Sequence, residues 1–250
     1  MLDILCIGAH PDDVEIGMGG TILNFKSDSY SVGILDITDG EPTPVGSHEK
    51  RIDESIRAKE LLSVNERITL DLPNRYLKDT PEGRIKIAEV IRNFKPRILF
   101  VPYWIDAHPD HVEASVLSDA ARFTAKLTRT EMKGDPFYPQ KVFYYFCTHL
   151  KMQIKPSFIV DISPYMDKKI ETVLSYKSQF HEQRREERVK QRLMDMGRHW
   201  GMLIGREYGE PFFCKEEIGL ESIRGVIIDE GRETRDDGRI VSRPSSFVPR

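Results

Sequence analysis

Six short runs of apolar and β-branched residues constrain the fold of this chain most, because most of them are uninterrupted rather than alternating. A strand with one face in water alternates apolar and polar side chains, whereas an unbroken apolar run indicates a strand covered on both faces, as in a parallel sheet. The strand-like runs cover residues 2–7, 32–37, 68–72, 98–101, 142–146 and 158–162.

Helical patterns lie between these runs. Ser47 can cap one helix, Thr80 and Pro81 begin a second that Pro96 ends, and a third is expected from about residue 111 to 126. This alternation predicts an α/β fold: a Rossmann-like three-layer arrangement with a mostly parallel sheet and helices on both faces. From Ser163 onward the pattern predicts additional C-terminal helices, and the charged run 181–192 is expected to be a solvated helix face.

Composition limits the domain count and the partners. A chain of 250 residues that is 39% hydrophobic can bury one large core, so we expect a single α/β domain over residues 1–214 and a polar C-terminal tail over residues 215–250. A net charge of −3 gives no field that would attract nucleic acid, and no apolar run reaches the length of a membrane span. The expected partner is a small molecule, and the expected location is the cytoplasm.

Two clusters of imidazoles and carboxylates directly follow predicted strands. The stretch GAHPDD covers residues 8–13, and YWIDAHPDH covers residues 103–111. Ligands of parallel α/β sheets bind at the carboxyl ends of the strands, so both clusters should face one crevice. Imidazole nitrogen and carboxylate oxygen suit Zn²⁺ or Fe²⁺, and buried carboxylates without a cation would repel one another. The sequence therefore predicts a metal centre.

The two clusters resemble the AHPDD and HPDH motifs of the PIG-L/LmbE-like family of zinc-dependent de-N-acetylases. The stretches TDGE, KRIDESIRAKELL, YKSQF and GEPFFCKEEIGL are similar to the branch that deacetylates N-acetylglucosaminyl-malate in bacillithiol biosynthesis. The resemblance covers about residues 2–220. It implies a hydrolase that releases acetate and a free amino sugar, an amino-sugar conjugate as substrate, and a homo-oligomer, for which the segment around Phe212 and Phe213 could supply an interface.

Carried over residue by residue, the resemblance makes His10, Asp13 and His111 the metal ligands. The cofactor it implies is Zn²⁺, and Fe²⁺ is the alternative that the same ligand types permit.

The resemblance also assigns three catalytic roles. Asp12 would be the general base that takes a proton from the attacking water, and His108 would be a protonated stabiliser of the tetrahedral oxyanion, held by the hydrogen bond that it donates to Asp110. Either Asp12 or His108 could protonate the leaving amine. Asp110 could instead cap the helix that follows it.

Four side chains are candidates for substrate contacts: Arg51, Glu41, Gln179 and Tyr103. A guanidinium offers a planar fork of donors, although a surface pair of Arg51 with Glu54 competes with this reading. Tyr103 and Trp104 could form a stacking wall for a sugar ring, with strand-end packing as the alternative, and His181 could reach the crevice from a later helix.

Two other classes of function compete with the hydrolase. A nucleotide-binding protein would need a phosphate loop, but Gly17, Gly19 and Gly20 do not follow GxGxxG, and close helix packing accounts for them better. A metal-bearing protein could also bind sugars without turnover, or the same core could deacetylate another N-acyl sugar or antibiotic conjugate.

Overall fold

The structure is a computed structural model that describes residues 1–147, 149–151, 154–180, 183–220, 232–234 and 240–242. The chain divides into two compact units, Met1–Glu216 and Glu217–Arg250. In the second unit, strand β8 (Arg232–Thr234) pairs antiparallel with β9 (Ile240–Ser242). No helix among the described residues is long and apolar enough to span a bilayer.

A seven-stranded sheet in the order β3-β2-β1-β4-β5-β7-β6 forms the centre of the first unit. Five strands run parallel: β1 (Ile4–Gly8), β2 (Val32–Asp36), β3 (Glu66–Thr69), β4 (Ile98–Pro102) and β5 (Lys141–Tyr145). The mostly parallel α/β fold predicted from the unbroken apolar runs is confirmed.

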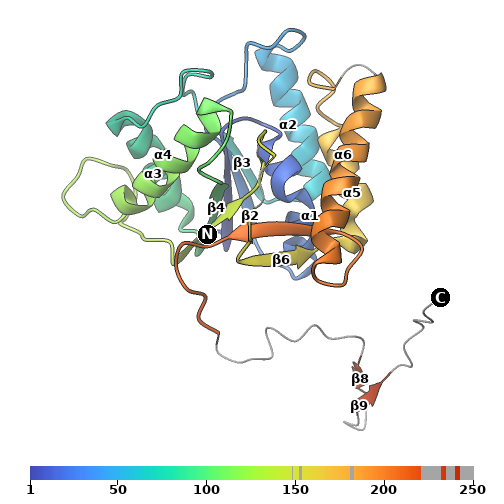
Figure 1. Ribbon diagram of the computed structural model, residues 1–250. Coiled ribbons are helices and arrows are strands. Elements are labelled where there is room, and N and C mark those ends of the chain that lie inside the picture. Colours follow the sequence, from blue (N-terminus) through green and yellow to red (C-terminus); the bar gives the residue numbers. More distant parts are fainter. Residues whose placement is uncertain (148, 152–153, 181–182, 221–231, 235–239, 243–250) are drawn as a thin grey trace. The chain divides into compact units, whose positions relative to one another are not determined.

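Helices cover both faces of this sheet, as Figure 1 shows. On one side lie α3 (Pro81–Phe94) and α4 (Pro109–Ala125). On the other side lie α1 (Asp13–Ser27), α2 (His48–Leu62), α5 (Met166–Val173) and α6 (Gln183–Met202). Ser47 and Thr80 cap α2 and α3 as predicted, because their hydroxyls accept from the backbone N–H groups of Lys50 and Gly83.

Helix α4 begins earlier than predicted. Pro109 occupies its first turn and His108 is its N-cap, so the expectation that Asp110 caps this helix is wrong. Proline suits the first helical position because its missing N–H would have no partner there.

Strand β7 (Gly209–Phe213), which sequence patterns missed, pairs antiparallel with both β5 and β6 (Phe158–Asp161). Pro211 in its middle weakens the strand signal. Phe212 is fully buried and stacks on Phe158 with ring centroids 5.2 Å apart. Phe212 therefore belongs to the core, whereas Phe213 is half-buried, and an interface between subunits at this segment stays a prediction.

Glycines let α1 approach its neighbours closely. A Cβ at Gly17 would lie 2.3 Å from the ring of Tyr145, and a Cβ at Gly20 would lie 2.7 Å from Ile162. The packing role predicted for these glycines is confirmed. This close contact fixes where the first turn of α1, with its acidic residues, meets the sheet.

A kink at Met18 (φ −150°, ψ 21°) interrupts α1. The backbone N–H groups of Gly20 and Thr21 donate to the carboxylate of Glu210 on β7, at 3.1 and 2.7 Å. Lys169 also donates to this buried carboxylate and balances its charge. The kinked helix is thereby tied to the sheet through hydrogen bonds as well as through packing.

A buried ion network lies between β2, β3 and α1. The guanidinium of Arg67, 4% exposed, makes two hydrogen bonds with Asp36 at 2.7 and 2.9 Å and one with Glu15 at 2.6 Å. Tyr176 donates to the same oxygen of Glu15 at 2.7 Å. Two buried carboxylates therefore depend on one cation.

We predict that Arg67→Met destabilises the fold by about 3–5 kcal/mol, because it leaves the buried carboxylates of Asp36 and Glu15 without a cation. The matched control is Arg57→Met, which removes an exposed guanidinium that pairs with Glu60 among the described residues and should cost less than about 1 kcal/mol. Urea unfolding measures both values. Equal losses of unfolding free energy in the two variants would show that the network contributes nothing particular to stability.

Candidate metal centre and active-site cavity

The topology of the sheet brings the two sequence clusters together. Strands β1 and β4 are parallel neighbours, so the segments that leave their carboxyl ends meet at one edge of the sheet. After β1 the chain passes through residues 9–12 into α1, and after β4 it passes through residues 103–108 into α4. From β1 the chain continues to β2 and β3 on one side of the sheet, whereas from β4 it continues to β5 on the other side. Parallel α/β sheets bind ligands at the point where the strand order reverses in this way.

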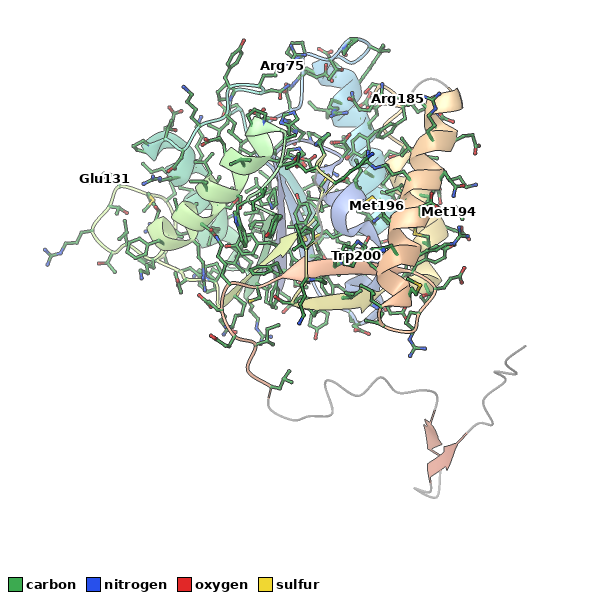
Figure 2. The ribbon with its side chains drawn as sticks, in the orientation of Figure 1. Arg75, Glu131, Arg185, Met194, Met196 and Trp200 are labelled. Carbon is green, nitrogen blue, oxygen red and sulfur yellow. The ribbon has the colours of Figure 1, made fainter. Side chains whose placement is uncertain are left out.

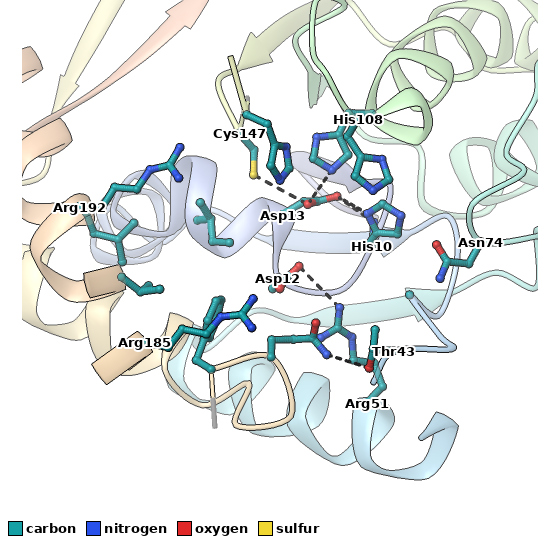
Figure 3. A pocket seen from close by; sticks show the side chains of 18 of the residues that line it. His10, Asp12, Asp13, Thr43, Arg51, Asn74, His108, Cys147, Arg185 and Arg192 are labelled. Carbon is teal, nitrogen blue, oxygen red and sulfur yellow. Dashed lines mark hydrogen bonds and ion pairs between the residues drawn. The ribbon is translucent and has the colours of Figure 1, made fainter. Parts of the chain in front are cut away.

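His10, Asp13 and His111 form a compact buried group at this point, as Figure 3 shows for its labelled members. Nδ1 of His10 lies 3.3 Å from Oδ2 of Asp13, and Nε2 of His111 lies 3.2 Å from Oδ1 of the same carboxylate. One ligand atom from each residue lies within 4.8 Å of the others. Two imidazoles and one carboxylate at this spacing fit a divalent ion such as Zn²⁺ or Fe²⁺.

Opposite charges hold this group together against the cost of burial. Burial opposes the charged form of His10, but Asp13 and Asp110 outweigh it and raise its pKa to about 9. Burial also opposes the charged form of His111, but Asp13 and Asp106 outweigh it and raise the pKa of His111 to about 10. The two imidazoles in turn hold the pKa of Asp13 well below its usual range in spite of burial. Metal binding takes deprotonated imidazole nitrogens, so an ion would replace protons at this position.

Further carboxylates orient the two imidazoles. Oδ2 of Asp106 lies 2.7 Å from Nδ1 of His111, and Oδ2 of Asp110 lies 3.2 Å from Nε2 of His10. Outer carboxylates of this kind fix the tautomer and the direction of a ligating histidine. Two overlapping groups also have ligand-like spacing: His10 with His108 and Asp110, and Asp106 with His111 and His149.

The contact between Asp110 and His108 differs from expectation. The carboxylate of Asp110 turns to His10 and accepts backbone N–H groups of Arg75 and Leu77, at 2.6 and 3.3 Å, instead of holding His108. His108 receives the backbone N–H of Asp110 at Nδ1, at 3.2 Å.

A nitrogen that accepts a hydrogen bond carries no proton, so the expectation of a doubly protonated His108 is wrong for this arrangement. Burial, followed by the neighbouring charges of His111 and His10, lowers the pKa of His108. The neutral ring keeps its hydrogen on Nε2. Its centroid lies 4.9 Å from that of His10 and 4.6 Å from that of His111.

Asp12 points away from Asp13 although the two residues are adjacent. Its backbone adopts φ 110° and ψ −23°, a region that costs energy for a residue other than glycine and that is found mainly at functional sites. Oδ1 of Asp12 lies 3.8 Å from Nη2 of Arg51. Burial raises the pKa of Asp12 to about 7, and the charge of Arg51 opposes that rise.

Arg51 is buried to all but 4% and lines the cavity, yet its Nε and Nη1 have no hydrogen-bond partner among the described residues. Its guanidinium stacks 5.5 Å from the ring centre of Tyr176. Glu54 accepts instead from the backbone N–H and hydroxyl of Ser178, at 2.6 Å each. The alternative of a surface pair between Arg51 and Glu54 is therefore wrong.

A cavity of about 550 Å³ opens above the metal centre. Gln179 lines it, as expected for a substrate contact, and its amide lies 3.3 Å from Oγ1 of Thr43. Asn74 and His149 add further polar groups to the wall. A cavity of this size accommodates a sugar conjugate of drug-like dimensions.

Two expected substrate contacts do not line this cavity. The carboxylate of Glu41 accepts the backbone N–H of Thr43 at 2.6 Å and so caps its own loop. Tyr103 is 8% exposed and lies between Trp104 and Phe146, with ring centroids 4.2 and 4.6 Å away. The strand-end packing alternative therefore holds for Tyr103. The expectation for His181 lies outside the described residues.

Sequence reasoning missed Arg185 and Arg192, which line the cavity from α6. The run 181–192 is expected to be a solvated face, and Arg185 and Arg192 are indeed exposed, but both also line the cavity. The sequence pattern that could have identified these arginines is their helical spacing with apolar residues. Arg185, Val189, Arg192 and Leu193 are spaced so that they lie on one side of a helix.

This chain is similar to known deacetylases. A family model described as GlcNAc-PI de-N-acetylase, PIG-L, matches residues 5–121. The diacetylchitobiose deacetylase of Thermococcus kodakarensis is 34% identical over 240 residues, which cover 90% of this chain and 84% of that protein.

Solved structures show the same architecture. A conserved protein of Thermus thermophilus superposes with a TM-score of 0.80 and 38% identity over 88% of this chain and 97% of its own. The N,N'-diacetylchitobiose deacetylase from Pyrococcus horikoshii gives a TM-score of 0.74 and 28% identity over 84% and 82% of the two chains.

We predict that the protein binds one divalent ion at this centre. Loss of a residue that only orients a metal ligand weakens metal binding by about 10- to 100-fold. His111→Ala removes a ligand itself, so it should weaken metal binding by more than that. Elemental analysis after dialysis and a metal titration measure the occupancy and the affinity. His48→Ala is the control, because this histidine is exposed and its ion-pair partner among the described residues is Asp39, which does not line the cavity. Equal metal affinity in the two variants would place the ion elsewhere.

Proposed function

This chain belongs to the PIG-L family of de-N-acetylases, and we propose that it hydrolyses the acetamide of an N-acetylglucosamine conjugate. The products are acetate and a free amino sugar. The observation that carries this proposal is the meeting of His10, Asp13 and His111 beside the carboxylate of Asp12, at the bottom of one cavity. This combination supplies a ligand set and a separate base next to each other, as metal-assisted hydrolysis requires.

We assign His10, Asp13 and His111 as the ligands of Zn²⁺, with Fe²⁺ as the alternative. When bound there, the ion supplies Lewis acidity, which polarises the amide carbonyl and makes water acidic enough to react near neutral pH.

Asp12 acts as the general base in this proposal. Its Oδ1 faces Arg51, which leaves Oδ2 to accept a proton as the water oxygen bonds to the carbonyl carbon. When the carbon–nitrogen bond breaks, the same carboxyl can return the proton to the departing amine. The distorted backbone of Asp12 keeps this carboxylate out of the ligand set of Asp13, so the two neighbours can perform different roles.

His108 stabilises the oxyanion in this proposal. Because Nδ1 accepts a backbone N–H, the ring presents its Nε2–H as a donor. A neutral donor fixed in advance can bind the negative oxygen that develops on the carbonyl. Asp110 acts through His10 rather than through His108, as a positioning residue for the metal ligand.

The sugar binds in the cavity through Arg51 and Gln179. The Nε and Nη1 nitrogens of Arg51 are buried and have no hydrogen-bond partner among the described residues, and a sugar hydroxyl or a carboxylate would satisfy them. For the full substrate we favour N-acetylglucosaminyl-malate, because the TDGE, YKSQF and GEPFFCKEEIGL stretches are similar to that branch. Diacetylchitobiose is the second candidate, because a relative with that activity is similar over most of the chain.

Asp12→Asn is expected to lower kcat by about 10²- to 10⁴-fold, since the amide cannot take the proton, while metal content stays at the wild-type level. Acetate release and elemental analysis on the same preparation measure both quantities. Asp39→Asn is the control, because this carboxylate lies nearby on the loop after β2 but outside the cavity lining. An Asp12→Asn enzyme with more than half of the wild-type kcat would refute the base assignment.

A panel of conjugates tests the substrate. We expect N-acetylglucosaminyl-malate to give the highest kcat/KM and diacetylchitobiose a lower one, with free amine measured for the zinc- and iron-loaded enzyme. A higher value for diacetylchitobiose would reverse the order of the two candidates. No acetate from any acetamido sugar would overturn the hydrolase itself.

A further inference from the structure

Helix α6 forms a positively charged wall of the cavity that the proposed hydrolysis does not use. The side chains on this wall are Arg185, Val189, Arg192, Leu193 and Met196. Their spacing places them on one stripe of the helix, with two guanidinium groups about two turns apart. Figure 3 shows Arg185 and Arg192 extending from α6 into the pocket, and Figure 2 labels Arg185 on the same helix as Met196.

Neither guanidinium on this wall has a hydrogen bond or an ion pair with a side chain that the structure describes. Arg185 lies 5.8 Å from the ring centre of Phe180, a contact that orients the guanidinium without neutralising its charge. The apolar neighbours Val189 and Leu193 supply no acceptor. Both side chains are exposed and line the cavity, so within the described part of the chain their hydrogen-bond donors face solvent.

The charges around the cavity are unbalanced. Its arginines are Arg51, Arg75, Arg185 and Arg192, whereas its carboxylates are Asp12 and Asp13, both assigned to the catalytic centre. The guanidinium of Arg75 is engaged by the carbonyl of Pro42. The surplus positive charge therefore lies along α6, where it would attract an anion.

We propose that Arg185 and Arg192 bind an anionic group, a carboxylate or a phosphate ester, on the part of the substrate beyond the amino sugar. This inference rests on the proposed hydrolysis of an N-acetylglucosamine conjugate in the same cavity. A guanidinium binds either oxyanion through two parallel N–H bonds. A neutral conjugate offers these two exposed guanidinium groups no opposite charge, so the wall favours an anionic conjugate.

The kinetic test compares three conjugates: N-acetylglucosaminyl-malate, N-acetylglucosamine 1-phosphate and neutral diacetylchitobiose. In the double variant Arg185→Gln, Arg192→Gln, the ratio of kcat/KM for an anionic conjugate to that for diacetylchitobiose should fall about 10- to 100-fold. A fall in the malate arm identifies a carboxylate site, and a fall in the phosphate arm identifies a phosphate site. Unchanged ratios in both arms would overturn the proposal.

The control is Arg188→Gln, which removes one positive charge from α6 at a position that is exposed, like Arg185 and Arg192, but does not line the cavity. It should keep the wild-type ratio of kcat/KM values. If the ratio of kcat/KM values fell equally in this control, the effect would come from the overall charge of α6. That result would also overturn the assignment of the two arginines.

Binding without turnover separates this inference from the proposed function. Calorimetry with the Asp12→Asn protein should show N-acetylglucosaminyl-malate or N-acetylglucosamine 1-phosphate binding about 10- to 100-fold more weakly once Arg185 and Arg192 are both Gln, and more weakly in high salt. Binding through the arginines without hydrolysis by the wild type overturns the hydrolase alone. Hydrolysis together with equal Kd values for the two proteins overturns the arginine site alone.

Discussion

One carboxylate shared by two imidazoles holds the candidate site together. Asp13 lies between His10, which follows β1, and His111, which follows β4 in the first turn of α4. Burial opposes the charge of each group, and only the attraction between opposite charges at about 3 Å outweighs that cost. The site therefore exists only while β1 and β4 are neighbours and α1 begins at Asp13, so the order of the sheet is itself a requirement of the chemistry.

Much of the first unit serves to hold the start of α1. Gly17 lets the helix lie against Tyr145, Glu210 accepts the N–H groups that the kink sets free, and Arg67 joins Glu15 in the first turn to two neighbouring strands. Each contact uses a different interaction: close packing, hydrogen bonding and ion pairing. Together they explain how a backbone as unfavourable as that of Asp12 persists, because the surrounding structure determines its position.

The parallel strands and the meeting of His10 with His111 could be predicted, because unbroken apolar runs and strand ends are local signals. Other features depend on three-dimensional context. Pro211 weakens the sequence signal of β7, a strand that is stabilised by pairing with β5 and β6 on its two sides. Tyr103 follows β4 directly, but its ring packs within an aromatic cluster and does not line the cavity. Arg192 belongs to a charged run in which inward and outward positions look alike until the helix is docked on the sheet.

The most direct test of the metal centre is X-ray diffraction from crystals of the zinc-loaded protein, with data collected on both sides of the zinc absorption edge. The account predicts a single anomalous peak at about 2.0–2.2 Å from a nitrogen of His10, a nitrogen of His111 and an oxygen of Asp13. A peak bound by Asp106 and His149 instead, or a peak away from all five residues, would contradict it.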